Sequence, residues 1–256
     1  MSRLKDRVTI VTGSGQGMGL AIAKCCAKEG AKIVITDIND QTIAQAVEEI
    51  KSLGVDAMGI KMDVTNKGQI KAMVDNVVKN WGKIDILVNN AGGALNTPYK
   101  LDEIEEKHWD LVVNVNLKGS FFCCQEVIPQ MVKQNGGVIV NISALAGHWR
   151  ASLAGVQYTA AKAGVEGLSR QLAYDWGPSG IRVNSLAPTV TMTGDRIQGL
   201  WDDKSNEEQD KILSAIPLRR LSTPEEIGAG VVFLASDDAS YITGITLDVC
   251  GGRYLR

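Results

Sequence analysis

The sequence predicts an α/β fold in which a doubly wound sheet carries helices on both faces. Two observations predict it. Short apolar and β-branched runs alternate with helix-length segments from end to end, and a glycine-rich run directly follows the first apolar run. The chain has 256 residues, of which 45% are hydrophobic. This length suits one large domain or two small ones, and because no linker or repeat interrupts the alternation, we expect a single domain over 1–256.

Seven short runs have the composition of buried parallel strands. Most are nearly continuous in apolar residues, as a strand covered by helices on both faces requires. The runs are VTIVT (8–12), KIVITD (32–37), AMGIKMD (57–63), IDILVNN (84–90), GVIVNIS (137–143), RVNSLA (182–187) and ITLDV (245–249).

Helix-length segments separate these runs. Between 70 and 82 the apolar residues recur with a period of 3.6, and the segments 18–30 and 43–54 have a similar length. Each segment ends at or next to a glycine, which favours a left-handed cap. These glycines are Gly30, Gly54 and Gly82.

One long polar segment, 193–220, breaks this alternation after the sixth strand candidate. Long insertions at the carboxyl ends of strands usually cover a ligand. We therefore expect a substrate-covering insertion over 190–216, with a simple surface excursion as the alternative.

Composition narrows the range of partners. The net charge is −2 and there is no basic run, which argues against nucleic acid. No stretch approaches the roughly 20 uncharged apolar residues of a membrane span, and the N-terminus lacks signal-peptide features. We therefore expect no membrane partner and a cytoplasmic protein. The five cysteines and two histidines form neither a metal-ligand spacing nor a disulfide framework, so we expect no metal.

The run TGSGQGMG, residues 12–19, lies between the first strand candidate and the first helix candidate. Gly13 permits a tight turn, while Gly17 and Gly19 let backbone amides approach a pyrophosphate at the helix N-terminus. The sequence therefore predicts a dinucleotide site. Its expected residues in this run are Gly13, Ser14, Gln16, Gly17, Met18 and Gly19.

Later strand ends extend this predicted site. Asp37 ends the second strand candidate, where its carboxylate can accept hydrogen bonds from ribose hydroxyls and would repel the 2′-phosphate of NADP. NAD is therefore favoured over NADP. The alternative is that Asp37 caps the next helix, for which Asp40 is at least as well placed. The other expected cofactor residues at strand ends are Ile38, Asp63, Val64, Asn90, Ala91 and Gly92.

Tyr158 and Lys162 stand four residues apart, so on a helix their side chains share one face. A tyrosine has a pKa of about 10, and a nearby ammonium group stabilises the phenolate and lowers that pKa. Tyr158 could then take the proton of an alcohol during oxidation, or donate it during reduction of a ketone. Two helix residues without a catalytic role are the alternative.

Together these motifs resemble the short-chain dehydrogenase/reductase family, in the branch whose members have about the length of this chain, 256 residues. The resemblance spans essentially the whole chain. The motifs that carry it are TGSGQGMG (12–19), Asp37, Asp63, NNAG (89–92), VNVNLKG (113–119), Tyr158 with Lys162, RVNSLAP (182–188), and the segment from TPEEIG to FLASDDASYITG (223–244).

The resemblance implies a Rossmann-type domain with a seven-stranded parallel sheet, hydride transfer between nicotinamide and a carbinol or carbonyl carbon, and a homo-oligomer. A homotetramer is expected, with a dimer as the alternative. It also implies that Asn116 locally distorts a helix and holds a water that links Lys162 to solvent. Lys162 would further bind the nicotinamide ribose, so Tyr158 and Lys162 are expected cofactor residues too. The substrate stays open, because it varies widely on this fold.

The sequence departs from the family pattern at the serine that positions the alcohol. In relatives this serine usually stands three residues after the strand asparagine, which here is Asn141, and that place holds Ala144. Either Ser143 performs the role or the hydroxyl is missing. We favour Ser143 as the fourth catalytic residue, beside Asn116, Tyr158 and Lys162.

After the sixth strand candidate, Pro188, Thr191 and Thr193 match positions that touch the nicotinamide in the family. Thr189 replaces the usual glycine there, which is expected to narrow the pocket. Near the place where family substrates lie, aromatic and basic side chains could bind a small polar molecule. The expected substrate residues are Ser143, His148, Trp149, Arg150, Tyr158 and Trp201.

Three functions fit these features. The first is an NAD-dependent alcohol dehydrogenase or ketone reductase that acts on a small polar metabolite such as a polyol or sugar derivative. The second is a 3-oxoacyl thioester reductase, acting on an acyl carrier protein or CoA derivative. Such reductases more often prefer NADPH, and Asp37 argues against that cofactor. The third is a nucleotide-binding protein without turnover, for which Ala144 is the only support.

Overall fold

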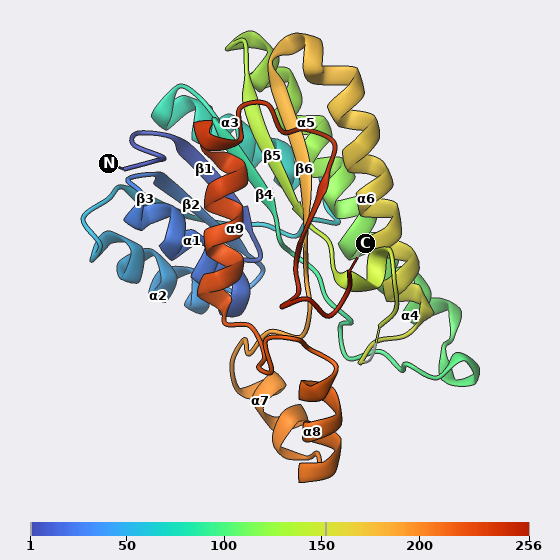
Figure 1. Ribbon diagram of the computed structural model, residues 1–256. Coiled ribbons are helices and arrows are strands. Elements are labelled where there is room, and N and C mark those ends of the chain that lie inside the picture. Colours follow the sequence, from blue (N-terminus) through green and yellow to red (C-terminus); the bar gives the residue numbers. More distant parts are fainter. Residues whose placement is uncertain (1, 152, 256) are drawn as a thin grey trace.

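The computed structural model, which describes residues 2–151 and 153–255, contains one seven-stranded parallel sheet (Figure 1). The strand order is β3-β2-β1-β4-β5-β6-β7. This arrangement confirms the predicted fold class. The strands are β1 (Val8–Thr12), β2 (Lys32–Asp37), β3 (Ala57–Lys61), β4 (Ile86–Asn89), β5 (Gly137–Ile142), β6 (Ile181–Pro188) and β7 (Thr246–Val249).

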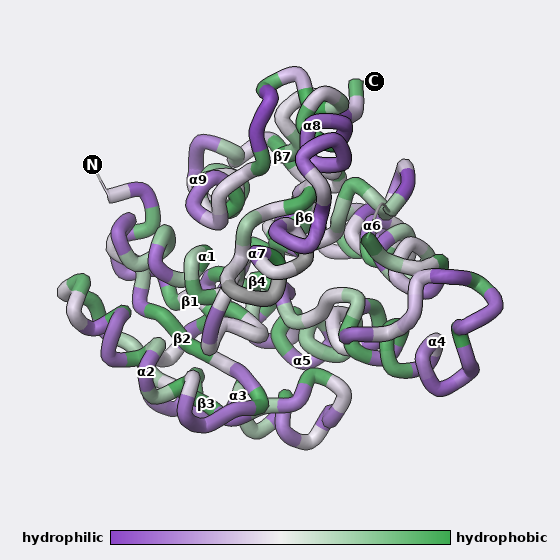
Figure 2. Tube along the Cα trace, turned by 90° about the horizontal axis from the view of Figure 1, so that it is seen from below, coloured by the Kyte–Doolittle hydropathy of each residue, from purple (hydrophilic) through white to green (hydrophobic). Residues whose placement is uncertain are grey.

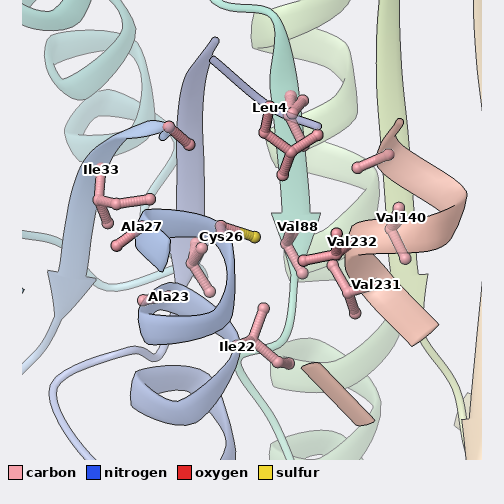
Figure 3. Close-up of a cluster of buried hydrophobic side chains, with 14 of the residues drawn as sticks. Leu4, Ile22, Ala23, Cys26, Ala27, Ile33, Val88, Val140, Val231 and Val232 are labelled. Carbon is pink, nitrogen blue, oxygen red and sulfur yellow. The ribbon is translucent and has the colours of Figure 1, made fainter. Parts of the chain in front are cut away.

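Helices cover both faces of the sheet, because alternate side chains of each strand point to opposite sides. On one face Ile33 and Ile35 of β2 join a cluster with α1 and α9, shown in Figure 3, whereas Val34 joins a second cluster with α3 and α5 on the other face. The helices are α1 (Gly17–Lys28), α2 (Asp40–Lys51), α3 (Lys67–Trp81), α4 (Glu106–Val113), α5 (Gly119–Lys133), α6 (Val156–Trp176), α7 (Asp195–Asp202), α8 (Asn206–Ser214) and α9 (Pro224–Ala235).

Helices α2 and α3 each begin three residues before the first apolar residue of their pattern. Asn39 caps α2 by accepting hydrogen bonds from the amides of Gln41 and Thr42, and Asn66 caps α3 by accepting one from Gln69. The first turn of each helix is polar, so the apolar periodicity of the sequence does not reveal it. The preceding asparagine, a preferred N-cap residue, does indicate where each helix begins. The predicted left-handed glycines that follow α1, α2 and α3 all have positive φ angles, between 75° and 84°.

The sheet changes its direction of winding between β1 and β4, which are neighbours in space although β2 and β3 separate them in sequence. In such sheets the carboxyl ends of the strands at this point border a crevice that can hold a ligand. Helices α7 and α8 project from the body at the same end of the strands (Figure 1), and Figure 2 shows that the residues of α8 are mostly hydrophilic. The predicted insertion therefore lies at the ligand end of the sheet.

Candidate active site

A cavity of about 850 Å³ lies at the carboxyl ends of the strands. A volume of this order is typical of ligand sites. Most of the residues expected from the sequence line it. These are Gly13, Gln16, Met18, Gly19, Asp37, Ile38, Asp63, Val64, Asn90, Ala91, Gly92, Ser143, Arg150, Tyr158, Lys162, Pro188, Thr191 and Thr193. Six other expected residues are not among its lining residues, namely Ser14, Gly17, Asn116, His148, Trp149 and Trp201.

The glycine-rich loop packs so closely against itself and against the segment after β4 that side chains would not fit at Gly13 and Gly19. A Cβ atom on Gly19 would overlap the carbonyl oxygen of Gly13, and one on Gly13 would lie 2.8 Å from the Cα of Ala91. Ser14 attaches the loop to β1 and β2, because its hydroxyl donates to the Val11 carbonyl and accepts from the Thr36 amide. The loop thereby leads into the N-terminus of α1 beside the cavity, which fits a dinucleotide pyrophosphate.

Asp37 is held at the end of β2 by two backbone amides. Its carboxylate accepts hydrogen bonds from Gly15 at 3.1 Å and from Ile38 at 2.8 Å. Both Asp37 and Ile38 line the cavity. A fixed negative charge at this place suits a ribose diol and opposes a phosphate.

Asn116 lies in a π-helical turn, Asn114–Lys118, between α4 and α5. The local distortion that the family resemblance implies is therefore present. Its side chain donates to the carbonyls of Val112 and Gly93 and accepts from the Gly93 amide. A Cβ atom on Gly92 would overlap the Asn116 amide oxygen, so glycine is needed there. Asn116 thus positions the loop after β4 without lining the cavity.

Tyr158 and Lys162 stand on the first turns of α6. The Lys162 ammonium lies 5.7 Å from the centre of the Tyr158 ring and donates a hydrogen bond of 2.7 Å to the Ile142 carbonyl. Burial raises the pKa of Tyr158 to about 12 and lowers the pKa of Lys162 to about 8. The pKa of Tyr158 therefore shifts opposite to our expectation, because burial disfavours the charged phenolate.

Ser143 does not direct its hydroxyl as expected for a residue that binds a substrate oxygen. The hydroxyl donates to the Glu166 carboxylate at 2.9 Å and lies 3.2 Å from the Lys162 carbonyl oxygen. Asn141, two residues earlier, likewise donates to Ser169 of α6. Positions 141 and 143 share a face because side chains alternate along extended chain, and that face is covered by α6. Both Ser143 and Ala144 line the cavity, and Ala144 has no hydroxyl to offer.

His148 lies in a polar cluster behind the cavity wall. Its Nδ1 atom is 2.9 Å from the Glu166 carboxylate and its Nε2 atom is 3.0 Å from that of Asp248. The ring of Tyr254 packs against it at 5.1 Å. The histidine was expected to contact substrate, but these contacts make it part of the frame that joins α6, β7 and the C-terminal segment.

Two tryptophans expected at the substrate also take other places. Trp149 contacts two arginines, because the guanidinium groups of Arg150 and Arg253 lie 4.9 Å and 5.9 Å from the centre of its ring. Trp201 of α7 lines a smaller neighbouring pocket together with Arg253. Of the aromatic and basic residues expected at the substrate, Arg150 and Tyr158 line the main cavity.

Sequence reasoning missed several residues that line the cavity, above all Arg253. This arginine follows β7 in the C-terminal segment, outside every motif, and its Nη1 atom lies 3.4 Å from the Thr189 hydroxyl. The apolar residues Leu153, Val190 and Ile197 line the same cavity. The sequence indicated these residues only through their location in the segments that follow β5 and β6.

Within 2–151 and 153–255, no group of three or more histidine, cysteine or acidic side chains is arranged to hold a metal ion. In the same part of the chain, no helix has the length and apolar character needed to cross a membrane. The five cysteines are free thiols.

Comparisons with known proteins agree with this geometry. A family model described as enoyl-(acyl carrier protein) reductase matches residues 13–253. The chain is 39% identical over 252 residues to a (2S)-((R)-hydroxy(phenyl)methyl)succinyl-CoA dehydrogenase subunit of Thauera aromatica, covering 98% of each chain. It is 39% identical over 247 residues to a 3-oxoacyl-(acyl-carrier-protein) reductase of Staphylococcus aureus, covering 96% of this chain and 97% of that protein.

A solved structure is similar over the same span. It is that of a candidate short-chain alcohol dehydrogenase from Sinorhizobium meliloti 1021, with a TM-score of 0.90 and 36% identity. The match covers 98% of this chain and 97% of the other. The likeness therefore extends over the whole fold, the cavity and the C-terminal segment included.

The buried ammonium of Lys162 should make stability depend on pH. Its pKa of about 8 in the folded protein lies below its ordinary value of 10.5, so between these values the unfolded chain binds one more proton. Lys162 should therefore contribute a rise of about 1.4 kcal/mol per pH unit to the free energy of unfolding in that window, because protonation favours the unfolded chain. The contribution is the difference in slope between the wild type and Lys162→Met, since burial raises the pKa of the Cys26, Cys123 and Cys124 thiols, which contribute with the opposite sign in both proteins. In Lys162→Met this rise should be absent.

Urea denaturation between pH 8 and about 10, below the window in which Tyr158 titrates, measures this slope. Lys71→Met is the matched control, because Lys71 is exposed and pairs with Asp75 on α3. Equal slopes in the wild type and Lys162→Met would contradict the assignment of a buried, easily deprotonated lysine.

Proposed function

Because the chain belongs to the short-chain dehydrogenase/reductase family, we propose that it interconverts a secondary alcohol and a ketone of a small polar metabolite with NAD(H). The chain is an oxidoreductase of a family that uses NAD(P)(H). The observation that carries the proposal is the pair Tyr158 and Lys162, which lie on one face of α6 and line a cavity that the glycine-rich loop also borders.

The residues present fit a dinucleotide. The glycine-rich loop would hold its pyrophosphate, Asp37 the adenosine ribose, Asp63 and Val64 the adenine, and Thr193 the carboxamide. When bound, the nicotinamide would supply or accept the hydride. Lys162 would then bind the second ribose, exchanging its contact with the Ile142 carbonyl for ribose hydroxyls.

Tyr158 would carry the proton of the reaction. In the reducing direction its hydroxyl donates a proton to the ketone oxygen, and in the oxidising direction its phenolate takes the proton of the alcohol. The raised pKa of Tyr158 suits donation, whereas oxidation requires a positive charge nearby to stabilise the phenolate. Lys162 supplies that charge when protonated. Asn116 acts by positioning, since it holds the loop that follows β4.

Ser143, which the sequence favoured as the residue that orients the substrate oxygen, has its hydroxyl engaged by Glu166 and Lys162. We infer that the second possibility raised by the sequence holds, namely that Ala144 leaves the usual serine position without a hydroxyl. Tyr158 then provides the side-chain hydrogen bond to the reacting oxygen. Loss of one neutral hydrogen bond, about 1 kcal/mol, reduces turnover without abolishing it.

A 3-oxoacyl thioester reductase is the second candidate. It is favoured by the names of the two curated relatives, each 39% identical, which refer to a CoA derivative and an acyl carrier protein substrate. Both candidates reduce a ketone with the same Tyr158 and Lys162. A comparison of 3-oxobutanoyl-CoA with simple ketones and polyols distinguishes them.

We also propose that the chain assembles into a homo-oligomer, with a tetramer as the expected state. Large apolar side chains are exposed on α4 and α5, among them Trp109 and Phe121, which are 42% and 40% exposed. Burial of these side chains against a second copy would remove them from water. Light scattering of the purified protein tests this assembly.

Replacement of Tyr158 by phenylalanine tests the proton-transfer role. Tyr158→Phe should lower kcat by about 10²-fold or more, because general acid–base catalysis contributes about 10²–10⁴. NADH affinity, measured by fluorescence titration, should change little, since Lys162 and the loop remain. Full turnover in this variant on any substrate of the wild type would contradict the role.

Asp37 should set the choice of cofactor. Asp37→Ser should raise the ratio of kcat/KM for NADPH over NADH by at least about tenfold, because the repulsion of a 2′-phosphate is removed. Asp40→Ser is the matched control, since Asp40 is an exposed carboxylate on α2 that pairs with Lys61. A wild-type protein that prefers NADPH would refute the proposed preference for NAD.

The two serine positions can be separated by exchanging hydroxyls. Ala144→Ser should raise kcat on a secondary alcohol, by up to about tenfold, because it adds a donor at the cavity wall. Ser143→Ala should lower stability by about 1–3 kcal/mol, since Glu166 loses a buried partner, and should affect kcat less than stability. If Ser143→Ala abolishes turnover while the protein stays folded, Ser143 is the alcohol-positioning residue after all.

A further inference from the structure

Two arginines border the cavity from segments that are distant in sequence. Arg150 follows β5, and Arg253 follows β7 in the C-terminal segment, yet both line the cavity that Tyr158 lines. They reach it from the side of the sheet that ends in β7. Asp37 ends β2 and Asp63 follows β3, and these two strands lie at the opposite side of the sheet. The arginines therefore stand apart from the place where the adenosine of a dinucleotide is proposed to bind.

Trp149 holds both guanidinium groups in place. Arg150 and Arg253 lie 4.9 Å and 5.9 Å from the Trp149 ring, at distances typical of cation–π contacts. Tyr254 packs against the same ring at 6.0 Å and also against His148. The rings of Trp149, Tyr254 and His148 are therefore in contact with one another beside the two arginines. Glu166 of α6 and Asp248 of β7 contact the two nitrogen atoms of His148, which attaches these rings to both elements.

The electrostatics of this corner favour a negative charge. Partial burial, and then repulsion by Arg150, lower the pKa of Arg253. The apolar residues Leu153, Val190 and Ile197 line the same two pockets as Arg253. The two carboxylates among the described residues that line the main cavity are Asp37 and Asp63, at the other side. An anion placed between the arginines would relieve their repulsion and accept their hydrogen bonds.

We propose that Arg150 and Arg253 form an anion subsite that binds a carboxylate or phosphate group carried by the substrate. The inference rests on the proposed function, because it names the class of alcohol or ketone on which Tyr158 acts: a hydroxy or oxo compound with an anionic group. Arginine suits this role because its planar donors match carboxylate and phosphate oxygens in pairs.

The test compares anionic ketones with neutral partners of the same length. The carboxylate pairs are 2-oxobutanoate, 3-oxobutanoate and 4-oxopentanoate, each with its methyl ester. The phosphate pair is dihydroxyacetone phosphate with dihydroxyacetone. Oxidation of NADH gives kcat/KM for each compound, and the quantity of interest is the ratio of the anionic to the neutral compound. The pair with the highest ratio identifies carboxylate or phosphate as the preferred group.

We expect the wild type to prefer at least one anionic compound over its neutral partner. Arg253→Gln and Arg150→Gln should each lower that ratio by at least about tenfold, because each removes a charge-assisted hydrogen bond. The kcat/KM of the neutral partner should fall much less than that of the anionic compound, because a neutral ketone makes no charge-assisted bond to either arginine. Arg170→Gln, which removes an exposed arginine of α6 that does not line the cavity, should leave the ratio unchanged.

A ratio that does not change in either variant would overturn the subsite. An equal loss on the anionic and the neutral compound would do so too, because it would indicate a structural role. If Arg253→Gln fails to fold, Arg150→Gln still tests the subsite, because Arg150 is exposed and its replacement disturbs less packing.

A binding measurement separates failure of this inference from failure of the proposed function. Calorimetric titration with malonate and with inorganic phosphate should detect binding to the wild type and to Tyr158→Phe, and at least about tenfold weaker binding to the double variant Arg150→Gln/Arg253→Gln. If no ketone is reduced but this pattern holds, the proposed function fails and the subsite stands. Equal or undetectable binding in wild type and double variant refutes the subsite, whatever the activity.

Discussion

Helix α6 is fastened to strand β5 by a line of buried polar contacts, and the geometry of the site depends on that attachment. Asn141 donates to Ser169, Ser143 donates to Glu166, and Lys162 donates to the Ile142 carbonyl. These groups are buried, so breaking any one of the three hydrogen bonds would leave an unsatisfied polar atom, at a cost of about 1–3 kcal/mol. Because Tyr158 precedes Lys162 by one turn on the same helix, this attachment also fixes where Tyr158 stands relative to the loop after β4.

The same attachment explains the electrostatic state of the site. Helix α6 presents Tyr158, Lys162 and Glu166 at successive turns, of which Lys162 and Glu166 are buried and Tyr158 is partly buried at the cavity. Glu166 keeps close polar neighbours in Ser143 and His148. Lys162 has a neutral carbonyl as its partner, so burial lowers its pKa, and the Tyr158 hydroxyl stays protonated far above neutrality. A change of charge around Tyr158 therefore has a large effect on its proton, because little water is present to screen it.

The sequence predicted the fold and the end of the cavity that the glycine-rich loop lines, because both depend on local patterns. Apolar runs located all seven strands to within two residues at either end, and the glycine-rich run located the loop before α1. Residues whose role depends on the direction of the side chain were harder to predict from the sequence. The side of β5 to which Ser143 points depends on the strand register relative to α6, and His148 is buried by partners on α6 and β7, far away in sequence. Arg253 lies in no motif, so tertiary structure was needed to bring it beside Arg150.

Ala144 and the two arginines together shift the way in which a substrate would be held. A serine hydroxyl at position 144 would have bound the reacting oxygen directly, through a neutral hydrogen bond worth about 1 kcal/mol. An anion held between Arg150 and Arg253 would instead fix the substrate at a remote group, through charge-assisted bonds worth about 1.5–3 kcal/mol each. Remote binding energy can orient a reacting carbon as effectively as a contact at the reacting oxygen, provided that the substrate is short and stiff enough. The separation between Tyr158 and the arginine pair would then select substrates by the distance between their carbonyl and their anionic group.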